Sequence, residues 1–468
     1  MPRLRRGWLG AGAVTVSVVL GITPVIADTL ENGLIQAYQN NPQINAQRAV
    51  VRQTDEGVPT ALSGYRPRIT ATASGGWQRT DQRTKSVSAA GTVTYPETHG
   101  DNGTRSFGIT ATQNIYNGFQ TANRTRQAEI NVSGARETLR LTEQTVLLDA
   151  ATVYMNLLQN TAILDLQKRN VEVIQEQLRQ TRDRFAVGEV TRTDVAQAES
   201  RVAAAQSAML GAQSNYTTSR AAYRRVIGIE PGRLSPGTPV DRLSPRTLEL
   251  AIAQGQAENP SVGAAAFGID AATLAVKISE GALYPTVNVV GQVQKTYETT
   301  PTVLESYTAS VIGQVSIPIY QGGSEYAAIR QTKELVGQRR LELAVNRDQA
   351  RANVVQAWGQ LEAAKAQITA TTAQVNAAEI ALNGVREEAR VGQRTTLDVL
   401  NAQQELVNAR VALVTAQRDR VVASYTLLAA VGRLAIPVLG LNVPLYDPMV
   451  HYQQVRDSWV GVRTPDGR

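Results

Sequence analysis

Apolar residues recur every seven positions through two long stretches that contain no proline. The first series consists of Ala150, Leu157, Leu164, Val171, Leu178 and Phe185. The second consists of Val354, Leu361, Ile368, Val375, Leu382 and Ala389. A sustained heptad repeat predicts helices that supercoil around one another along one apolar seam. At a rise of about 1.5 Å per residue, roughly 67 residues in each stretch give helices about 100 Å long.

Each long helix is predicted to end at a glycine and to be followed by a helix that returns. Val187-Gly188 and Val391-Gly392 follow the two series, and glycine just beyond a helix is typical of a C-terminal cap. A second heptad series comes after each glycine. The pattern therefore predicts two antiparallel helical hairpins, at about 120–228 and 323–432.

Alternation of apolar and polar residues predicts a pair of β-strands before each hairpin. The pairs are expected at about 68–80 with 104–116, and at about 286–298 with 306–318. Their length is that of a tilted membrane-crossing strand. Four strands cannot close a barrel, and open sheet edges are not tolerated in lipid, so these strands predict oligomerisation. The alternative is two soluble β-hairpins covered by another part of the structure. The polar connections at 81–103 and 299–305 are predicted to be loops.

The sequence contains two copies of this arrangement of strands and helices. The segment Thr29-Leu30-Glu31 recurs 218 residues later as Thr247-Leu248-Glu249, and Tyr116-x-Gly118 recurs 204 residues later as Tyr320-x-Gly322. A repeat of this length defines the structural unit. The predicted units are 28–230 and 246–434, each a helix, a strand pair and a helical hairpin. A proline-rich linker, 231–245, joins them, and 435–468 is predicted to be an irregular tail.

Composition narrows the possible functions. Residues 1–27 have three arginines before an apolar run and small residues before Asp28, which predicts a secretory signal peptide. Without those arginines the net charge falls from +7 to +4, and no basic stripe supports nucleic-acid binding. The chain has no cysteine, and no catalytic triad, phosphate loop or metal-ligand cluster is evident, so neither an enzyme nor a bound cofactor or metal is expected.

Taken together, the signal peptide, the duplicated strand pair with hairpin, and Val-Gly-x-x-Thr-x-x-Asp-Val at both hairpin tips resemble the TolC family of outer membrane ducts. The most specific match is the segment from Val391 to Leu400. The resemblance covers 28 to about 432. It implies a mixed α and β membrane protein that forms a homotrimer in the outer membrane of a Gram-negative bacterium. Each protomer would give four transmembrane strands to a twelve-stranded β-barrel and long coiled-coil hairpins to an α-helical periplasmic tunnel.

The resemblance also implies function and partners. It implies the passive exit duct of a tripartite efflux pump, a type I secretion system, or both. Substrate would come from an inner-membrane proton-driven or ABC transporter through a periplasmic membrane-fusion adaptor protein, with outer membrane lipid around the barrel. Two other classes of protein share some of these features. A trimeric coiled-coil surface adhesin carries its strands only at the C-terminus, and a periplasmic structural or adaptor protein lacks lipid-facing alternation. The sequence does not specify the cargo.

By the same resemblance, the hairpin tips are the candidate site. Asp398 takes the position of a pore-entrance aspartate and Arg394 that of an arginine that holds the closed state. Thr193 and Asp194 match its partners on the other hairpin, while Asn401 stands where many members have a second aspartate and Ala389 where many have a latch tyrosine. Contact with the adaptor is expected at the remaining tip residues, Val187, Gly188, Arg192, Arg390, Val391, Gly392 and Thr395.

Two interpretations of the tip aspartates remain open. Three symmetry-related carboxylates at a narrow entrance concentrate cations and repel one another, which raises their pKa values. Alternatively, Thr191 and Thr395 are helix N-caps, and Asp194 and Asp398 complete a capping-box variant at the third helical position. The two roles are compatible.

Overall fold

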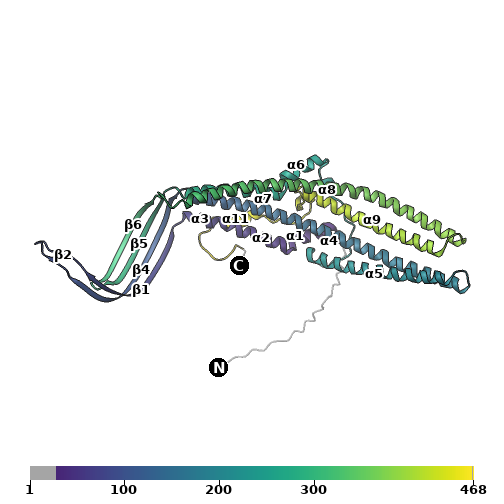
Figure 1. The fold of residues 1–468 in the computed structure, drawn as a ribbon, viewed down its shortest axis with the longest axis horizontal. Coiled ribbons are helices and arrows are strands. Elements are labelled where there is room, and N and C mark those ends of the chain that lie inside the picture. Colours follow the sequence, from purple (N-terminus) through teal and green to yellow (C-terminus); the bar gives the residue numbers. More distant parts are fainter. Residues whose placement is uncertain (1–27, 466, 468) are drawn as a thin grey trace, which may run out of the picture.

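The computed structural model describes residues 28–465 and 467, so the predicted signal peptide lies outside the described part. The molecule is long and narrow, with a β-sheet at one end and the tips of two helical hairpins at the other (Figure 1). The first repeat begins with α1 (Leu30–Asn40), α2 (Pro42–Asp55), α3 (Gly57–Leu62) and the short 3-10 helix η1 (Ser63–Tyr65). Its hairpin consists of α4 (Gln120–Ala186) and α5 (Arg192–Ile227).

The second repeat has the same elements. Helices α6 (Leu248–Glu258) and α7 (Pro260–Gly281) lead into the sheet, and α8 (Ser324–Arg390) and α9 (Thr396–Ala430) form the second hairpin. The stretch Leu248–Gly281 is long and apolar enough to cross a membrane by composition. It is broken at Asn259-Pro260, however, and α7 packs against α4 and α8, so it belongs to the helical body.

The four long strands form one antiparallel sheet in the order β1-β4-β5-β6. They are β1 (Arg68–Arg83), β4 (Glu97–Asn117), β5 (Thr286–Thr300) and β6 (Val303–Ser316). The central pair, β4 with β5, joins the two repeats. Strands β1 and β6 are the edges, and each has a neighbour on one side only in the described chain.

The first strand pair extends further than its sequence pattern predicts. Residues 81–103, expected to be a loop, continue β1 to Arg83 and start β4 at Glu97, and between them β2 (Ser86–Val87) pairs with β3 (Val93–Thr94). Polar pairs such as Asp81 opposite His99 occupy this extension. Alternation marks a strand only where one face is apolar, so a strand that is polar on both faces gives no such signal. In the second repeat β6 ends at Ser316, two residues before Pro318, which has no N–H to donate.

The two faces of the sheet differ in polarity. On one face, aligned neighbours are apolar, as in Ala71 opposite Ile109, Ile109 opposite Val293, and Val293 opposite Ala309. On the other face most neighbours are polar, with Val290 opposite Ile312 as an apolar pair among them. Gln294 lies opposite Thr308, and its amide donates to Ser106 at 3.3 Å. The apolar side chains are exposed in the single chain. This combination is that of a barrel wall with lipid outside and water inside.

The duplication holds at the level of single contacts. Arg68 lies opposite Thr112 in the first strand pair, and Thr286 opposite Ser316 in the second, which are the same positions moved by 218 and 204 residues. The N-cap amide of Asn41 donates to the carbonyl of Val226 at 2.9 Å, and Asn259 donates to Ala430 at 3.1 Å. The sequence offsets therefore identify structurally equivalent residues in both the helices and the sheet.

The main apolar core lies midway along the helices, where the duplicated N-terminal helices cover the long ones. The heptad positions predicted in α4 are largely buried, but Phe185 at the tip is exposed because the seam ends before it. The hydroxyl of Tyr154 lies 2.6 Å from the carbonyl of Asp28 and 2.8 Å from that of Ser235. It thus fixes both the start of the described chain and the linker, which contains the 3-10 turn η2 (Asp241–Leu243).

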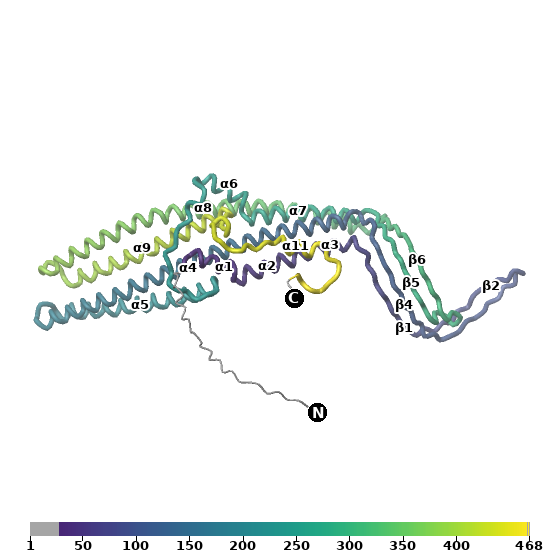
Figure 2. The backbone as a smooth tube through the Cα atoms, turned by 180° about the vertical axis from the view of Figure 1, so that it is seen from behind, coloured from purple at the N-terminus to yellow at the C-terminus, as the bar shows by residue number. Residues whose placement is uncertain are grey.

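The prediction of an irregular C-terminal tail was wrong in part. Residues 435–468 include α10 (Ile436–Leu439) and α11 (Pro448–Val455), and the tail runs back along α2 and α3 toward the sheet (Figure 2). The ring nitrogen Nδ1 of His451 lies 3.0 Å from Oδ2 of Asp55, whose side chain is fully buried. Arg66 lies over the ring of Trp459 and donates to the carbonyl of Ser458. The tail packs through these few specific contacts, so its sequence carries no heptad repeat from which its helices could be predicted.

Candidate functional site: the hairpin tips

Both hairpin tips begin with the same helix ending. In the first, the N–H of Gly188 donates to Phe185 at 3.0 Å and that of Glu189 to Arg184 at 2.9 Å. In the second, Gly392 and Gln393 make the equivalent bonds at 3.2 and 2.9 Å. This pair of bonds is the Schellman motif, which requires a residue with positive φ after the helix. Gly188 and Gly392 have φ values of +83° and +79°, so glycine is needed at both positions.

Both returning helices begin with a reciprocal cap. The backbone N–H of Asp398 donates to Oγ1 of Thr395 at 3.3 Å, and Oδ2 of Asp398 accepts from the backbone N–H and the hydroxyl of Thr395 at 3.0 and 2.9 Å. Thr191 and Asp194 make the same three bonds at 3.3, 2.8 and 2.7 Å. The capping-box interpretation is therefore confirmed at both tips. Each aspartate satisfies a donor that would otherwise have no partner at the helix start.

The electrostatics of the aspartates within one protomer differ from the expectation of raised pKa values. Hydrogen bonds from the backbone N–H and hydroxyl of Thr395 hold the pKa of Asp398 below its usual value, and Arg394 contributes in the same direction. The hydroxyl and backbone N–H of Thr191 likewise lower the pKa of Asp194. Because bonds to the charged form favour ionisation, both carboxylates are ionised at neutral pH.

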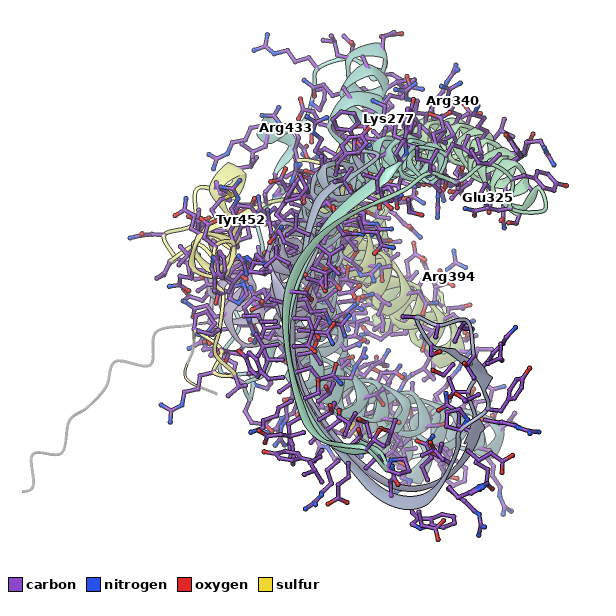
Figure 3. The ribbon with its side chains drawn as sticks, turned by 90° about the vertical axis from the view of Figure 1, so that its left-hand side faces the viewer. Lys277, Glu325, Arg340, Arg394, Arg433 and Tyr452 are labelled. Carbon is purple, nitrogen blue, oxygen red and sulfur yellow. The ribbon has the colours of Figure 1, made fainter. Side chains whose placement is uncertain are left out.

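Arg394 makes its ion pair within its own tip. Its Nε donates to Oε2 of Glu388 at 2.8 Å, across the turn. Among the described residues, neither Thr193 nor Asp194 is paired with Arg394 in the protomer, so the expected link to the other hairpin is not formed within one chain. Seen along the long axis, the sheet and helices curve in an arc, and Arg394 lies on its concave side, with Tyr452 on the convex side (Figure 3).

The contact between the two hairpins near their tips is made elsewhere. Oδ1 of Asn401 accepts from a guanidinium N–H of Arg201 on α5 at 2.6 Å. Next to it, Leu400 is buried against Ile174 and Ala198 of the first hairpin. Sequence reasoning placed Asn401 at the site because of its position, but it missed Arg201 and Leu400. Leu400 was detectable as an apolar residue just outside the heptad of its own hairpin.

The residues expected to contact an adaptor form the outer rim of the tips. Val187 and Val391 are 72% and 71% exposed, which is unusual for valine at a helix end and leaves an apolar spot on each tip. Arg390 pairs with Glu387 at 3.1 Å, while Arg192 begins α5 directly after the cap residue Thr191. Each tip therefore presents an exposed valine between charged side chains, and the first tip adds the exposed Phe185.

Within residues 28–465, no group of three or more His, Asp or Glu side chains is placed to hold a metal ion. Both histidines of the chain have carboxylate partners: His451 pairs with Asp55, and His99 lies 2.7 Å from Asp81. These partners lie far away in the sequence or across a strand pair, so spacing alone did not reveal them.

Comparison with known proteins gives consistent matches. A family profile described as outer membrane efflux protein matches residues 34–229 and 251–433. The chain is 42% identical over 465 residues to the outer membrane efflux protein BepC of Brucella suis biovar 1, covering 98% of each chain. It is 25% identical over 433 residues to the outer membrane protein TolC of Vibrio cholerae, covering 90% of this chain and 94% of the relative.

A solved structure shares the fold. The outer membrane protein VceC from Vibrio cholerae superposes with a TM-score of 0.72 at 18% sequence identity, covering 86% of this chain and 96% of that chain. The family profile matches both repeats of the duplication, one with each of its two segments.

Proposed function

The chain belongs to the outer membrane efflux protein family, and from this membership we propose that three copies assemble into one continuous duct from the periplasm to the cell exterior. The protein is an outer membrane exit duct. In the proposed assembly each protomer gives four strands to a twelve-stranded barrel. The two hairpins of each protomer give four helical segments to the periplasmic tunnel.

The observation that carries this proposal is the sheet. It has one apolar and one polar face, and its edge strands β1 and β6 have no second neighbour within the described chain. In hydrocarbon, each unpaired backbone group costs several kcal/mol, so such a sheet is stable in a bilayer only when its edges are closed. Pairing β6 of one copy with β1 of the next closes the sheet, puts polar residues such as Gln292 and Gln294 inside, and leaves the apolar face to lipid.

The position of the strands also separates this function from an adhesin. Each strand pair precedes its own hairpin, and the hairpins run away from the sheet by the full length of α4 and α8. With the barrel in the outer membrane, the tips reach deep into the periplasm. That geometry suits a tunnel which receives substrate at the tips and releases it through the barrel.

For the tips, the proposal assigns two roles. Asp398 and Asp194, both ionised, supply negative charge at the periplasmic entrance, and Arg394, Thr193 and Asn401 contribute to holding that entrance narrow. The rim residues Val187, Gly188, Arg192, Arg390, Val391, Gly392 and Thr395 meet a periplasmic adaptor protein. An inner-membrane transporter, proton-driven or ATP-driven, supplies the energy.

The test of the duct is substrate accumulation in the native host. Deletion of the gene is expected to raise the intracellular level of ethidium, and a plasmid copy of the gene is expected to return ethidium to the wild-type level. If ethidium is unchanged but a secreted protein disappears from the medium and returns on complementation, the duct serves type I secretion. If neither ethidium nor any secreted protein responds to deletion, in a strain shown to express the wild-type chain, the exit-duct proposal fails.

A further inference from the structure

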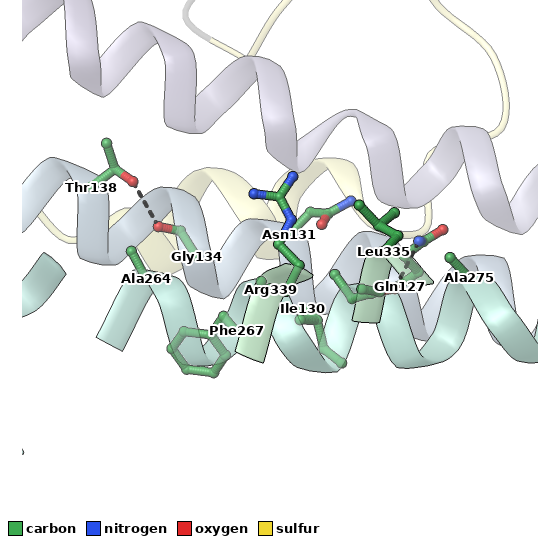
Figure 4. Close-up of a pocket in the computed structure, with 13 residues that line it drawn as sticks. Gln127, Ile130, Asn131, Gly134, Thr138, Ala264, Phe267, Ala275, Leu335 and Arg339 are labelled. Carbon is green, nitrogen blue, oxygen red and sulfur yellow. Dashed lines mark hydrogen bonds between the residues drawn. The ribbon is translucent and has the colours of Figure 1, made fainter. Parts of the chain in front are cut away.

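The C-terminal tail lies on the convex side of the helical body. One face of α4 lines a cavity of about 360 Å³ shared with α7 and α8, through Gln127, Asn131, Gly134 and Thr138 (Figure 4). Glu129 and Arg136 each lie two residues from those positions, which at about 100° per residue turns them to the opposite face. There Glu129 lies 3.7 Å from Arg456, and Nη1 of Arg136 lies 2.9 Å from Sδ of Met449. The tail therefore packs on the face of α4 that points away from the cavity, on the side where Figure 3 shows Tyr452.

The end of the tail reaches the level at which the sheet begins. Nη1 of Arg66 donates to the carbonyl of Ser458 at 2.6 Å, and its guanidinium carbon lies 4.5 Å from the ring centroid of Trp459. Arg66 has extended backbone angles and leads through Pro67 into β1. At about 3.3 Å per residue, Ile69, the first residue of β1 on the apolar face, lies about 10 Å beyond Arg66. Trp459 is therefore held close to the periplasmic boundary of the lipid-facing surface.

From Trp459 onward the tail exposes its apolar side chains. Trp459 is 68% exposed, Val460 90% and Val462 100%, and none of the three belongs to an apolar cluster of the described residues. Single exposed apolar residues are ordinary on a protein surface. Three of them within four residues, positioned by Arg66 on the helical body, form a contiguous exposed patch, and such patches mark sites of interaction.

Positive charge surrounds this patch. Arg66, Arg68 and Arg463 have no carboxylate partner among the described residues, and Asp457 is the only acidic residue in 456–463. Exposed Trp and Val side chains next to unpaired arginines match a phospholipid leaflet, in which indole rings lie at the headgroup level and cations meet the phosphates. The level of the patch, about 10 Å from the first lipid-facing strand residue, favours the same partner over a soluble protein.

The second repeat has an aromatic residue at the same level. The equivalent of Arg66, 218 residues later, is Tyr284, which is 52% exposed and is also followed by a proline that leads into a strand. Tyrosine and tryptophan are enriched at membrane boundaries. In the first repeat this position is an arginine, and Trp459 of the tail places its ring over it. Both repeats thus present an exposed aromatic ring where the sheet meets the helices.

We propose that residues 458–463 form an anchor in the periplasmic leaflet of the outer membrane. In this tail anchor the exposed side chains insert at the headgroup level, and the neighbouring guanidinium groups bind phosphates of anionic phospholipids: the inserted residues are Trp459, Val460 and Val462, and the phosphate-binding residues are Arg66, Arg68 and Arg463. The inference goes beyond the exit duct, and it depends only on the sheet lying in the outer membrane. Each protomer then contacts the bilayer twice, through its strands and through its tail.

The absence of cysteine allows a spin label to be attached at a single position of the full chain. We would label Val462→Cys, reconstitute the protein in nanodiscs of phosphatidylethanolamine with phosphatidylglycerol, and measure by EPR how accessible the label is to oxygen and to a water-soluble nickel chelate. Oxygen concentrates in lipid and the chelate stays in water. The label is expected to be accessible to oxygen and protected from nickel, and Val460→Cys is expected to give the same result.

Two exposed valines supply matched controls. Val311→Cys lies on the apolar face of β6 and is 80% exposed, so it reports the lipid, whereas Val391→Cys at the second hairpin tip is 71% exposed and reports water. Adding Arg463→Gln to Val462→Cys is expected to lower the ratio of lipid-bound to water-exposed label about fivefold, because that is roughly what one cation near an anionic leaflet contributes. Replacing phosphatidylglycerol by phosphatidylcholine is expected to lower the ratio further.

The outcomes separate the tail anchor from the duct. If the labels at Val460 and Val462 are as accessible to nickel as the label at Val391, the tail lies in water and the anchor is refuted, while the duct stands. Protection from both reagents would mean that protein, such as a second copy, covers the patch, which also refutes the anchor. Insertion that responds neither to Arg463→Gln nor to phosphatidylcholine would refute the binding of anionic headgroups. If the label at Val311 is itself in water, the sheet is not in lipid and both proposals fail.

Discussion

The two roles assigned to the second hairpin tip, helix cap and entrance charge, predict different responses to two substitutions. Thr395→Ala removes the hydroxyl that accepts from the N–H of Asp398 and donates to its carboxylate, but keeps the charge. Asp398→Asn removes the charge but keeps an amide oxygen that accepts from the N–H of Thr395. One change therefore affects mainly the cap and the other mainly the field at the entrance.

The magnitude of the cap effect follows from the lost bonds. Replacing a threonine N-cap by alanine costs about 1 kcal/mol, which is roughly a fivefold rise in the equilibrium constant for opening of the first turn. Amides of 396–399 in the Thr395→Ala variant are therefore expected to exchange hydrogen about five times faster than in wild type. Thr191→Ala is the matched control in the first tip, with the same bonds, and is expected to show the same acceleration there and none at 396–399.

The charge effect is read by single-channel recording in planar bilayers. Asp398→Asn is expected to lower cation selectivity and weaken block by divalent cations, whereas Thr395→Ala leaves both close to wild type. Because the pKa of Asp398 lies below its ordinary value of 3.8, the carboxylate is ionised from pH 8 down to pH 5, and the difference between variant and wild type is expected to be constant over that range. Unchanged selectivity and block in Asp398→Asn would refute the entrance role, and unchanged exchange in Thr395→Ala would refute the cap argument.

Three further predictions concern other parts of the chain. Burial raises the pKa of Glu143 to about 7 from 4.5, so the contribution of this group to stability is full below pH 4.5 and falls as the pH rises to 7. Glu143→Gln is expected to remove this part of the pH dependence in urea unfolding, a gain above pH 7 of at most about 3 kcal/mol. His451→Ala leaves the buried Asp55 without its ring partner, at a cost of about 1–3 kcal/mol, and is expected to make the tail susceptible to trypsin. His451→Gln keeps a hydrogen-bond donor and is expected to protect the tail, so equal cleavage of the two variants contradicts a role for this contact. The double variant Val187→Glu with Val391→Glu is expected to abolish complementation of the deletion without lowering the amount of protein in the outer membrane, whereas Val187→Ala with Val391→Ala retains most activity. Full complementation by the double Glu variant rules out an apolar adaptor contact at these positions.

Much of the fold was predictable because its determinants are periodic. Heptads predicted all four long helices, and the offsets predicted that the two halves share one architecture. The extension of β1 and β4 through residues 81–103 was missed because both of its faces are polar, so the backbone pairs without any alternation in the sequence. The tail was missed for a related reason: α11 is eight residues long and is held by His451 and its partner Asp55, 396 residues apart in the sequence.

The site was predictable in its backbone but not in its pairing. Gly188, Gly392 and the two Thr-x-x-Asp segments have local requirements, namely positive φ and a cap, that can be read from a few adjacent residues. The partner of Arg394 cannot be read in this way. Its guanidinium reaches Glu388 across the turn, and two long, flexible side chains that meet on a surface leave no periodic pattern.

The hydrogen bonds within each tip are stronger than the contact between the two hairpins, and this difference determines how the entrance opens. Each tip is closed by a Schellman motif and a capping box, so unwinding a tip breaks several backbone hydrogen bonds at once. The link between the hairpins near the tips is weaker than the tips themselves. The hydrogen bond from Arg201 to Asn401 is exposed and is worth about 1 kcal/mol or less, and Leu400 is the main buried residue that α9 contributes to this link. The entrance is therefore expected to widen by movement of whole hairpins relative to each other, with the tips themselves intact. Arg201→Ala is accordingly expected to raise the fraction of open channels without changing hydrogen exchange at 187–191 or 391–395, and faster exchange at the tips in that variant would contradict rigid-hairpin opening.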